Sequence, residues 1–280
     1  MASFTVQRAS ASAAGENRGL TRMTIAPGDV TDALSSIGVT QGSAVLVHAD
    51  AIVAAHFPPM SNDRRLDLLI EAIEAAIGGP GTLVIPTFSY SFTKGEPFDV
   101  LRTKSEVGMV SERFRMLPGV YRSTDPIFSF ACRGRLAREL CAIPVKECFG
   151  EDSVFAALHR LNAGIVDLGC SMSRGGTFVH YVETAHGVDY RYNKVFSGTV
   201  ILPDQQTRDC SVVYNVRDLT RESGADFRRL QKRLTDEGKL RSATVGKSRI
   251  LAVTANDLFQ TAWKMLDEDP VSLIAEGAGK

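Results

Sequence analysis

The segment Ile165–Glu183, IVDLGCSMSRGGTFVHYVE, joins two different hydrophobic patterns. Its first five residues form an apolar run that is typical of a strand buried on both faces. A Gly-Gly turn at Gly175 then leads into a short segment with helical apolar spacing, which carries His180 and Glu183. A buried strand followed by a turn and a helix is the repeating unit of an α/β fold.

The same alternation extends toward the N-terminus. Apolar runs predict strands at 44–48 (AVLVH), 82–87 (TLVIPT) and 127–132, in addition to 165–169. Helical spacing and capping residues predict helices at 31–37, 66–77, 105–117, 134–142 and 153–161. Because continuous Val/Ile/Leu strands alternate with helices, we predict a three-layer α/β/α fold with a mixed sheet.

The pattern changes after residue 194. Two strands at 195–202 and 210–216 flank a turn and predict a β-hairpin, which is followed by a charged helix at 225–238, a strand at 248–253 and a helix at 256–267. We therefore predict a C-terminal antiparallel β/helix elaboration, with 194–255 as a possible antiparallel subdomain. The predicted boundaries are a flexible tail at 1–22, a single domain at 23–270 and a second tail at 271–280.

Composition excludes several classes of protein. The chain has 280 residues, 44% of them apolar, which is enough to bury a substantial core. Lys plus Arg equals Asp plus Glu at 32 each, so no net positive field favours nucleic acid or an anionic membrane. No apolar run approaches the roughly 18 residues of a membrane span. The five cysteines have no CxxC spacing, which predicts reduced thiols. The N-terminus has no apolar signal core, so we predict a cytoplasmic protein.

Common catalytic motifs are missing from the sequence. It contains no Walker phosphate loop, no Rossmann GxGxxG, no Gly-x-Ser-x-Gly nucleophile elbow and no His-Glu-x-x-His. The acyl-CoA signature of the common small acetyltransferase fold, Arg/Gln-x-x-Gly-x-Gly/Ala, is also absent. If the protein handles an acyl-CoA, it uses a different fold.

His180 and Glu183 form the candidate site of proton transfer. On a helix they lie about 60° apart, so the imidazole and the carboxylate share one face, as in a general-base pair. A solvated surface pair would have the same spacing. His186 completes HxxExxH, a possible metal pattern, but it lies about 120° from His180 around the helix, so the three side chains do not converge.

Six segments, in order along the chain, resemble the aminoglycoside 3-N-acetyltransferases. They are GSAVLVHAD at 42–50, GGPGTLVIPTFS at 78–89, PGVYRSTDPIFSFACRG at 118–134, FGEDSVFAAL at 149–158, IVDLG at 165–169 and TFVHYVE at 177–183. The resemblance implies transfer of an acetyl or other acyl group from acyl-CoA to a primary amine of an amino sugar, without a metal. It also implies small-molecule partners, no nucleic acid and no membrane, with a homodimer as a possible assembly.

The resemblance also assigns residues. It implies catalytic roles for His180, Glu183 and Asp125, and acceptor binding by Glu183, Asp125 and Tyr190. Segments that follow strands are expected to hold the pantetheine arm and the phosphates of CoA, because sites in open α/β sheets lie beyond the carboxyl ends of the strands. The expected CoA-binding residues are His48, Ala49, Asp50, Ala51, Ile52, Thr87, Phe88, Ser89, Arg122, Ser123, Ser129 and Thr177.

Two departures from the family pattern bear on the acceptor. Members that modify antibiotics usually carry His where this chain has Asp125, and often Ser or Thr where it has Asp50. These differences favour biosynthetic relatives, which acylate amino sugars that are commonly nucleotide-linked. Antibiotic resistance, by acetylation of the 3-amino group of aminoglycosides, is the alternative.

Two functions of other classes stay open. One is a metal-dependent amide hydrolase that uses His180, Glu183 and His186, and the other is a catalytically inactive CoA- or sugar-binding module. Metal analysis of the purified protein would test the first, and ligand binding without thiol release would indicate the second.

Overall fold

A seven-stranded mixed sheet organises the protein, whose computed structural model describes residues 24–275. The strand order is β4–β5–β2–β1–β6–β10–β9. The three central strands are parallel to one another: β2 (Thr82–Pro86), β1 (Ala44–Ala49) and β6 (Gly164–Leu168). Antiparallel strands extend both edges: β5 (Phe130–Gly134), β4 (Tyr121–Arg122), β10 (Ser248–Thr254) and β9 (Arg241–Val245). The predicted mixed sheet is confirmed.

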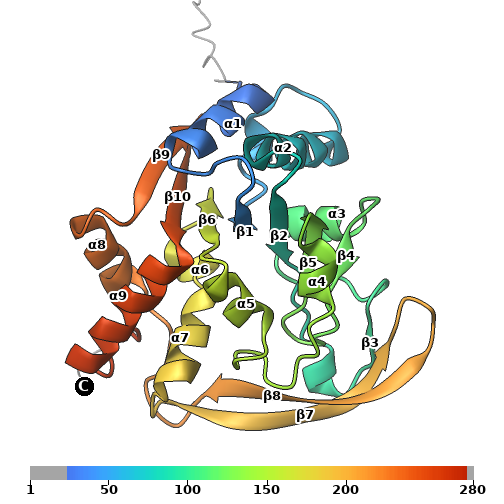
Figure 1. The fold of residues 1–280 in the computed structure, drawn as a ribbon, viewed down its shortest axis with the longest axis vertical. Helices are drawn as coiled ribbons and strands as arrows, with labels where there is room; N and C mark the ends of the chain where they lie inside the picture. The colour runs from blue at the N-terminus through green and yellow to red at the C-terminus, as the bar shows by residue number, and fades with distance from the viewer. Residues whose placement is uncertain (1–23, 276–280) are drawn as a thin grey trace, which may run out of the picture.

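Helices cover both faces of this sheet (Figure 1). One face packs against α1 (Pro27–Ser36), α2 (Asn62–Ile77) and α3 (Met109–Arg115). The other packs against α4 (Ala137–Cys141), α5 (Val154–Arg160), α7 (Phe178–His186), α8 (Arg228–Asp236) and α9 (Ala255–Glu268). Short helices lie at α6 (Met172–Gly175), η1 (Ala54–His56) and η2 (Phe92–Lys94).

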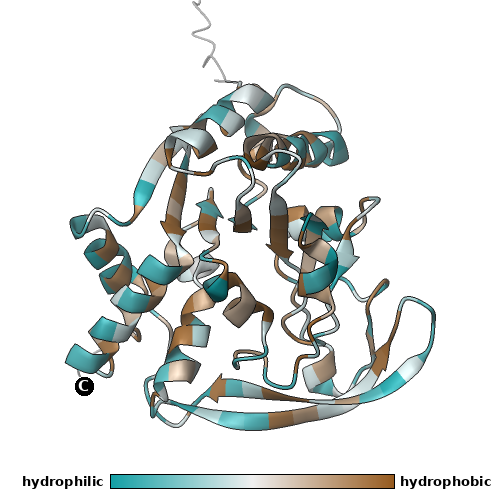
Figure 2. Ribbon diagram, viewed as in Figure 1, coloured by the Kyte–Doolittle hydropathy of each residue, from teal (hydrophilic) through white to brown (hydrophobic). Residues whose placement is uncertain are grey.

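Alternation along the strands explains the two helical layers. In β1, Val45 and Val47 join one buried cluster and Leu46 joins the other, and all three are at most 1% exposed. A strand whose side chains are buried on both faces needs an apolar layer on each side. Figure 2 shows the result, with apolar colour on the inner strands and polar colour on the outer faces of α2 and α9. The three-layer prediction is therefore confirmed.

The long hairpin of β7 (Arg191–Ile201) and β8 (Thr207–Arg217) runs along one side of the molecule (Figure 1). It forms a separate three-stranded sheet with β3 (Phe98–Asp99). The predicted hairpin is present, but residues 194–255 do not form one separate subdomain, because β9 and β10 pair within the main sheet. β9 itself was not predicted.

Two helices start earlier in the chain than the sequence predicts. α1 begins at Pro27 rather than at Thr31, because Pro suits the first helical position and the Asp29 carboxylate accepts the Ala26 N–H at 2.7 Å. α2 begins after Ser61, whose hydroxyl caps the Arg64 N–H.

The ends of the chain also bear on the predicted boundaries. The tail predicted at 1–22, and residue 23, lie outside the described residues. Residues 271–275 do not behave as a tail: Leu273 is fully buried, and its carbonyl accepts the Asp226 N–H at 3.0 Å. Within residues 24–275, no helix is both long enough and apolar enough to span a bilayer.

Candidate active site

Helix α7 places His180 and Glu183 one turn apart. Phe178, Val179 and Val182 are fully buried and anchor the helix against the core. Gly187 ends the helix with φ of 78°, a left-handed conformation that favours glycine. The chain then turns directly into β7, which brings Tyr190 and Arg191 back beside Glu183.

Glu183 is a buried carboxylate with three partners. Its Oε1 accepts the Tyr190 hydroxyl at 2.9 Å, and its Oε2 lies 2.6 Å from His180 Nδ1. Arg191 Nε lies 2.7 Å from Oε2 as an ion pair, although its N–H is not aligned as a hydrogen bond. Burial alone would raise the pKa of Glu183, but His180, Arg191 and Tyr190 together lower it. Glu183 is therefore an ionised carboxylate at neutral pH.

The Glu183 carboxylate orients the His180 ring. An ionised carboxylate only accepts hydrogen bonds, so it favours the tautomer with the proton on Nδ1. Arg191 Nη2 also lies 2.8 Å from Nδ1 and could donate only to an unprotonated Nδ1. That lone pair would then face the acceptor-only Glu183 oxygen at 2.6 Å, so we assign the proton to Nδ1 and the hydrogen bond to Glu183, and treat Arg191 as a nearby charge. Nε2, on the other side of the ring, carries the free lone pair.

The pKa of His180 is lowered from its ordinary value. Burial is the largest cause and the positive charge of Arg191 the second, while Glu183 opposes both. A lowered pKa keeps the imidazole neutral near pH 7, which is the form that accepts a proton.

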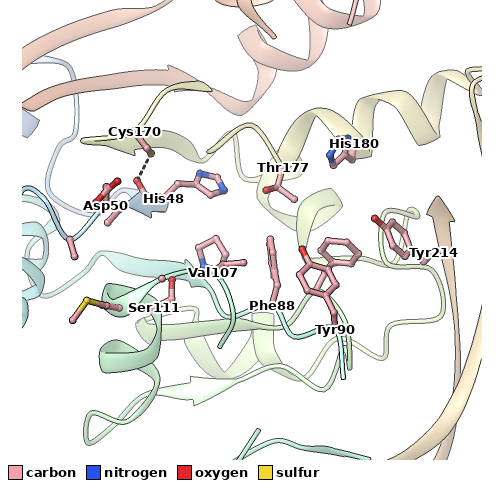
Figure 3. A pocket seen from close by; sticks show the side chains of 16 residues that line it. His48, Asp50, Phe88, Tyr90, Val107, Ser111, Cys170, Thr177, His180 and Tyr214 are labelled. Atoms are coloured by element: carbon pink, nitrogen blue, oxygen red, sulfur yellow. Dashed lines mark hydrogen bonds between the residues drawn. The ribbon is translucent and has the colours of Figure 1, made fainter. Parts of the chain in front are cut away.

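His180 faces a cavity of about 490 Å³ (Figure 3). The cavity lies where β1, β2 and the start of α7 meet, beside β8 of the hairpin. Its lining comprises His48, Ala49, Asp50, Ala51, Pro86, Phe88, Tyr90, Val107, Gly108, Met109, Ser111, Phe128, Cys170, Thr177, His180 and Tyr214. The carboxyl ends of β1 and β2 contribute to it, as expected for an open α/β sheet.

Part of the predicted CoA-binding set lines this cavity. The predicted residues that line the cavity are His48, Ala49, Asp50, Ala51, Phe88 and Thr177. Ile52 lies outside it and is 51% exposed. Four other predicted residues do not line the cavity: Thr87, Ser89, Ser123 and Ser129. Each is at most 1% exposed, which leaves it no surface on which to bind a ligand.

Arg122 is not available for the phosphates of CoA. Its guanidinium donates to the hydroxyls of Thr87 and Ser129 and to the carbonyls of Thr87, Val100 and Thr103, at 2.5 to 3.2 Å. Burial, followed by the charge of Arg115, lowers the pKa of Arg122 to about 9, so it remains protonated at neutral pH. The predicted phosphate role gives way to a structural one.

Asp125 is likewise structural. It is 2% exposed and does not line the cavity, and its Oδ1 accepts the backbone N–H groups of Ile127 and Phe128 at 2.8 and 2.9 Å. Burial raises the pKa of this carboxyl. The geometry supports neither the catalytic nor the acceptor role that was predicted for Asp125, because the side chain caps its own loop.

Tyr190 and Glu183 are both fully buried, so neither can touch an acceptor directly. Tyr190 instead holds Glu183 through its hydroxyl. His186 turns away: its Nε2 lies 3.1 Å from Asp267 on α9 and its ring packs against Trp263. Within residues 24–275, no group of three His, Cys, Asp or Glu side chains has a metal-binding arrangement.

Several lining residues were not predicted from the sequence. The most prominent are Tyr90, Phe128 and Tyr214, which form an aromatic wall with Phe88. No contact with Glu183 or His180 was predicted for Arg191, which touches both. Its position directly after Tyr190 was a usable signal, whereas nothing local in the sequence places Tyr214 near His180.

An imidazole held by a buried carboxylate, with its free nitrogen facing a cavity, is the arrangement of a general base. Among the residues that line the cavity, none is a serine or cysteine paired with this imidazole. The fold and the site are those of an α/β enzyme whose imidazole is placed where it can take a proton from a nucleophile bound in the cavity.

Comparison with known proteins gives the family. The family model described as aminoglycoside 3-N-acetyltransferase matches residues 46–267. Aminoglycoside N(3)-acetyltransferase IV of Salmonella sp. is 30% identical over 243 residues, covering 85% of this chain and 86% of the relative. The chain belongs to the aminoglycoside 3-N-acetyltransferase family and is therefore an N-acetyltransferase.

Solved structures agree with this assignment. Apoenzyme AAC(3)-IVa has a TM-score of 0.71 and 26% identity, over 91% of this chain and 93% of that one. A His-to-Ala variant of the same enzyme is in complex with apramycin, with a TM-score of 0.70 and 26% identity over 89% and 95% of the two chains. AAC-IIIb in a binary complex with CoASH, at 19% identity, shares the fold with a TM-score of 0.74 over 87% of this chain and 96% of its own.

Proposed function

We propose that the protein transfers the acetyl group of acetyl-CoA to an amino group of an aminoglycoside, with His180 as the general base. The observation that carries the proposal is the His180–Glu183 pair, with Nδ1 held at 2.6 Å and the ring facing the cavity. The proposed acceptor is supported by relatives that bind aminoglycosides at about a quarter identity, AAC(3)-IVa with apramycin among them.

The chemistry needs one base and no covalent enzyme intermediate. An alkylamine is mostly protonated at pH 7 and must lose a proton before its lone pair can attack a thioester. That first proton passes to solvent; His180 Nε2 then takes the second proton from the attacking neutral amine as the N–C bond forms and the C–S bond breaks. The imidazolium then returns the proton to the departing thiolate, which gives CoA thiol and leaves His180 neutral. Glu183 stabilises the imidazolium during this cycle.

The aromatic side chains that line the cavity can bind a cationic amine. Phe128 packs edge-on against Phe88 and Tyr214, at centroid distances of 5.0 and 4.9 Å. Aromatic faces attract ammonium groups, and desolvation strengthens that attraction. Asp50, also in the lining, adds a negative charge. The rings near Tyr214 would hold the amine beside His180, whereas Asp50 lies toward the other end of the cavity.

A nucleotide-linked amino sugar is the second candidate acceptor. The buried position of Asp125 removes one of the two sequence differences that favoured it, because that residue does not face the cavity. One observation still favours it: among the sixteen described residues that line the cavity, Asp50 is the single acidic one. A polycationic aminoglycoside would find few carboxylates there, whereas an acceptor with one amine needs only one.

A comparison of kcat/KM distinguishes the acceptors. Thiol release from acetyl-CoA should be measured with apramycin, gentamicin and a uridine-diphosphate amino sugar, with each product checked by mass spectrometry. The proposal expects acceptor-dependent release with at least one aminoglycoside, and kcat/KM at least tenfold above that of the nucleotide sugar, a difference of about 1.4 kcal/mol. Turnover of the nucleotide sugar alone would reverse the assignment of the acceptor.

A further inference from the structure

Tyr214 reaches the catalytic cavity from the hairpin. It lies on β8, and its side chain lines the cavity. Figure 3 shows the ring extending from the hairpin with its hydroxyl on the side of His180 and Tyr90. Burial is the largest influence on the pKa of this hydroxyl, and the charges of Arg191 and Glu183 are among the others, so the hydroxyl lies within electrostatic reach of the catalytic pair.

Three phenylalanine rings fix the side chain of Tyr214. Its ring centroid lies 4.9 Å from that of Phe128, 6.0 Å from that of Phe149 and 6.3 Å from that of Phe196. Phe149 also packs edge-on against His180, with the centroids 5.7 Å apart. Because one buried ring contacts both side chains, the hydroxyl and the imidazole are held in place relative to each other. A group that orients a reactant needs such a fixed position.

The hydroxyl of Tyr214 has no hydrogen-bond partner among residues 24–275. Two other tyrosines differ: the Tyr190 hydroxyl donates to Glu183 at 2.9 Å. That of Tyr181 lies 3.3 Å from His159 Nδ1. Burial raises the pKa of Tyr214 above the ordinary value for tyrosine, so the hydroxyl stays protonated at neutral pH. Because the hydroxyl of a half-buried tyrosine needs a partner, a bound molecule in the cavity is the group that supplies one during the reaction.

The reacting amine has a hydrogen-bond donor to offer. Once neutral, a primary amine carries two N–H groups and one lone pair. His180 takes the proton of one N–H, and the lone pair points at the thioester carbonyl. The second N–H then points away from both and needs an acceptor of its own. A tyrosine oxygen near the imidazole supplies that acceptor, and the three directions around the nitrogen set the angle of attack.

Two other hydroxyls in the cavity suit this task less well. Thr177 lies three residues before His180 and, in Figure 3, on the side toward His48. Tyr90 is 36% exposed, so water reaches it more readily. Tyr214 alone combines a half-buried position with a ring that is fixed through a neighbour of the base.

We propose that Tyr214 determines specificity for a primary amine, by accepting with its hydroxyl oxygen the N–H of the reacting nitrogen that His180 does not take. A secondary amine has a carbon at that position and cannot make the contact. The inference rests on the proposed function, because it needs an acceptor amine beside His180. It gives the hairpin a direct contact with the reacting atoms.

Thiol release with paired acceptors tests the inference. Each enzyme is assayed with apramycin and with apramycin methylated on the nitrogen that the wild type acetylates, a position identified in the product by NMR. Tyr214→Phe keeps the ring and removes only the hydroxyl oxygen. We expect the ratio of kcat/KM for the primary over the secondary amine to fall about tenfold in Tyr214→Phe, while the KM for acetyl-CoA stays within about twofold. If the wild type uses gentamicin or the nucleotide amino sugar instead, the pair is made from that acceptor.

A control variant and a stability measurement separate this contact from a structural role. Tyr192→Phe changes an exposed tyrosine on β7 outside the cavity and should leave the ratio unchanged. Because the Tyr214 hydroxyl has no partner among residues 24–275, Tyr214→Phe should keep Tm within about 2 °C of the wild type.

An unchanged primary-to-secondary ratio in Tyr214→Phe would overturn the inference, even if both rates fell. A hydroxyl that stabilised the oxyanion, or one that only supported the fold, would slow both acceptors equally and leave the ratio as it was. Failure of Tyr214→Phe to fold, or a loss of many degrees in Tm, would also overturn it, because the hydroxyl would then be bonded within the protein. The proposed function fails by a different result, namely no thiol release by the wild type with any of the amines, and the inference would fail with it.

Discussion

At the scale of single residues, the proposed mechanism depends on opposed effects at His180. Burial and Arg191 favour the neutral ring, while Glu183 favours the charged one. The first two prevail, so the base is ready at neutral pH, yet the imidazolium that forms during the reaction is still stabilised by a carboxylate 2.6 Å away. A surface His–Glu pair would lack this balance, because solvent would screen both charges.

The pH profile of kcat/KM follows from these shifts. The neutral ring is the active form, so the acid limb due to the enzyme should rise with pH through the lowered pKa of His180, and ionisation of the free amine adds a separate rise at higher pH. We expect the midpoint of the acid limb below about 6.5, the ordinary histidine value. A midpoint above this value would contradict the electrostatics described for the site.

Replacing Glu183 by Gln should move the acid limb of the pH profile to still lower pH. Glu183 is the group that raises the pKa of His180, so Glu183→Gln should shift the midpoint to lower pH and reduce kcat by about tenfold or more, since the imidazolium loses its stabilising charge. The matched control is Glu71→Gln, a surface carboxylate on α2 that pairs with Arg64. An unshifted limb in folded Glu183→Gln would remove Glu183 from the account.

At the scale of elements, Arg122 connects three segments of the fold. It joins the residue after β2 to the loops beside β3 and β5, through carbonyls and hydroxyls of Thr87, Ser129 and Thr103. Arg122→Met would leave these buried acceptors unsatisfied. We expect a loss of about 3 kcal/mol in the free energy of unfolding and a fall in Tm of roughly 5–10 °C.

The same variant distinguishes the two roles of Arg122. If the side chain is structural, CoA affinity measured well below Tm should stay within about twofold of the wild type. If Arg122 bound the phosphates, affinity would fall and Tm would change little. Calorimetric unfolding and CoA titration on one preparation decide between these results.

Sequence patterns predicted elements well where apolar spacing was strong. Five elements have buried residues at fixed periods, which a sequence displays directly. They are the strands β1, β2 and β6 and the helices α2 and α7. β9 escaped prediction because its residues are mostly polar and exposed on an edge strand. The structure does not support the roles predicted for Asp125 and Arg122, because both are buried and proximity to a family motif says nothing about burial. The local signal of Asp125, an Asx turn before Ile127, was available and pointed to a structural role.

At the scale of the whole molecule, the site is assembled from distant parts of the chain. His48 comes from β1, His180 from α7 and Tyr214 from the far strand of the hairpin. The family resemblance predicted the first two, because both stand in its motifs. The hairpin has no such motif, and only its packing across the sheet brings Tyr214 to the cavity, so its contribution could not be derived from spacing along the sequence.

The central claim is that His180 removes a proton from an amino-sugar amine so that acetyl-CoA can acylate it. The most direct test is acceptor-dependent thiol release by the wild type, His180→Ala and the matched control His186→Ala, whose histidine contacts Asp267 away from the cavity. We predict that His180→Ala lowers kcat by about 10²–10⁴-fold with CoA affinity nearly unchanged, and that His186→Ala turns over normally. Near-normal turnover by a folded His180→Ala protein, or thiol release that does not depend on the amine, would contradict the account.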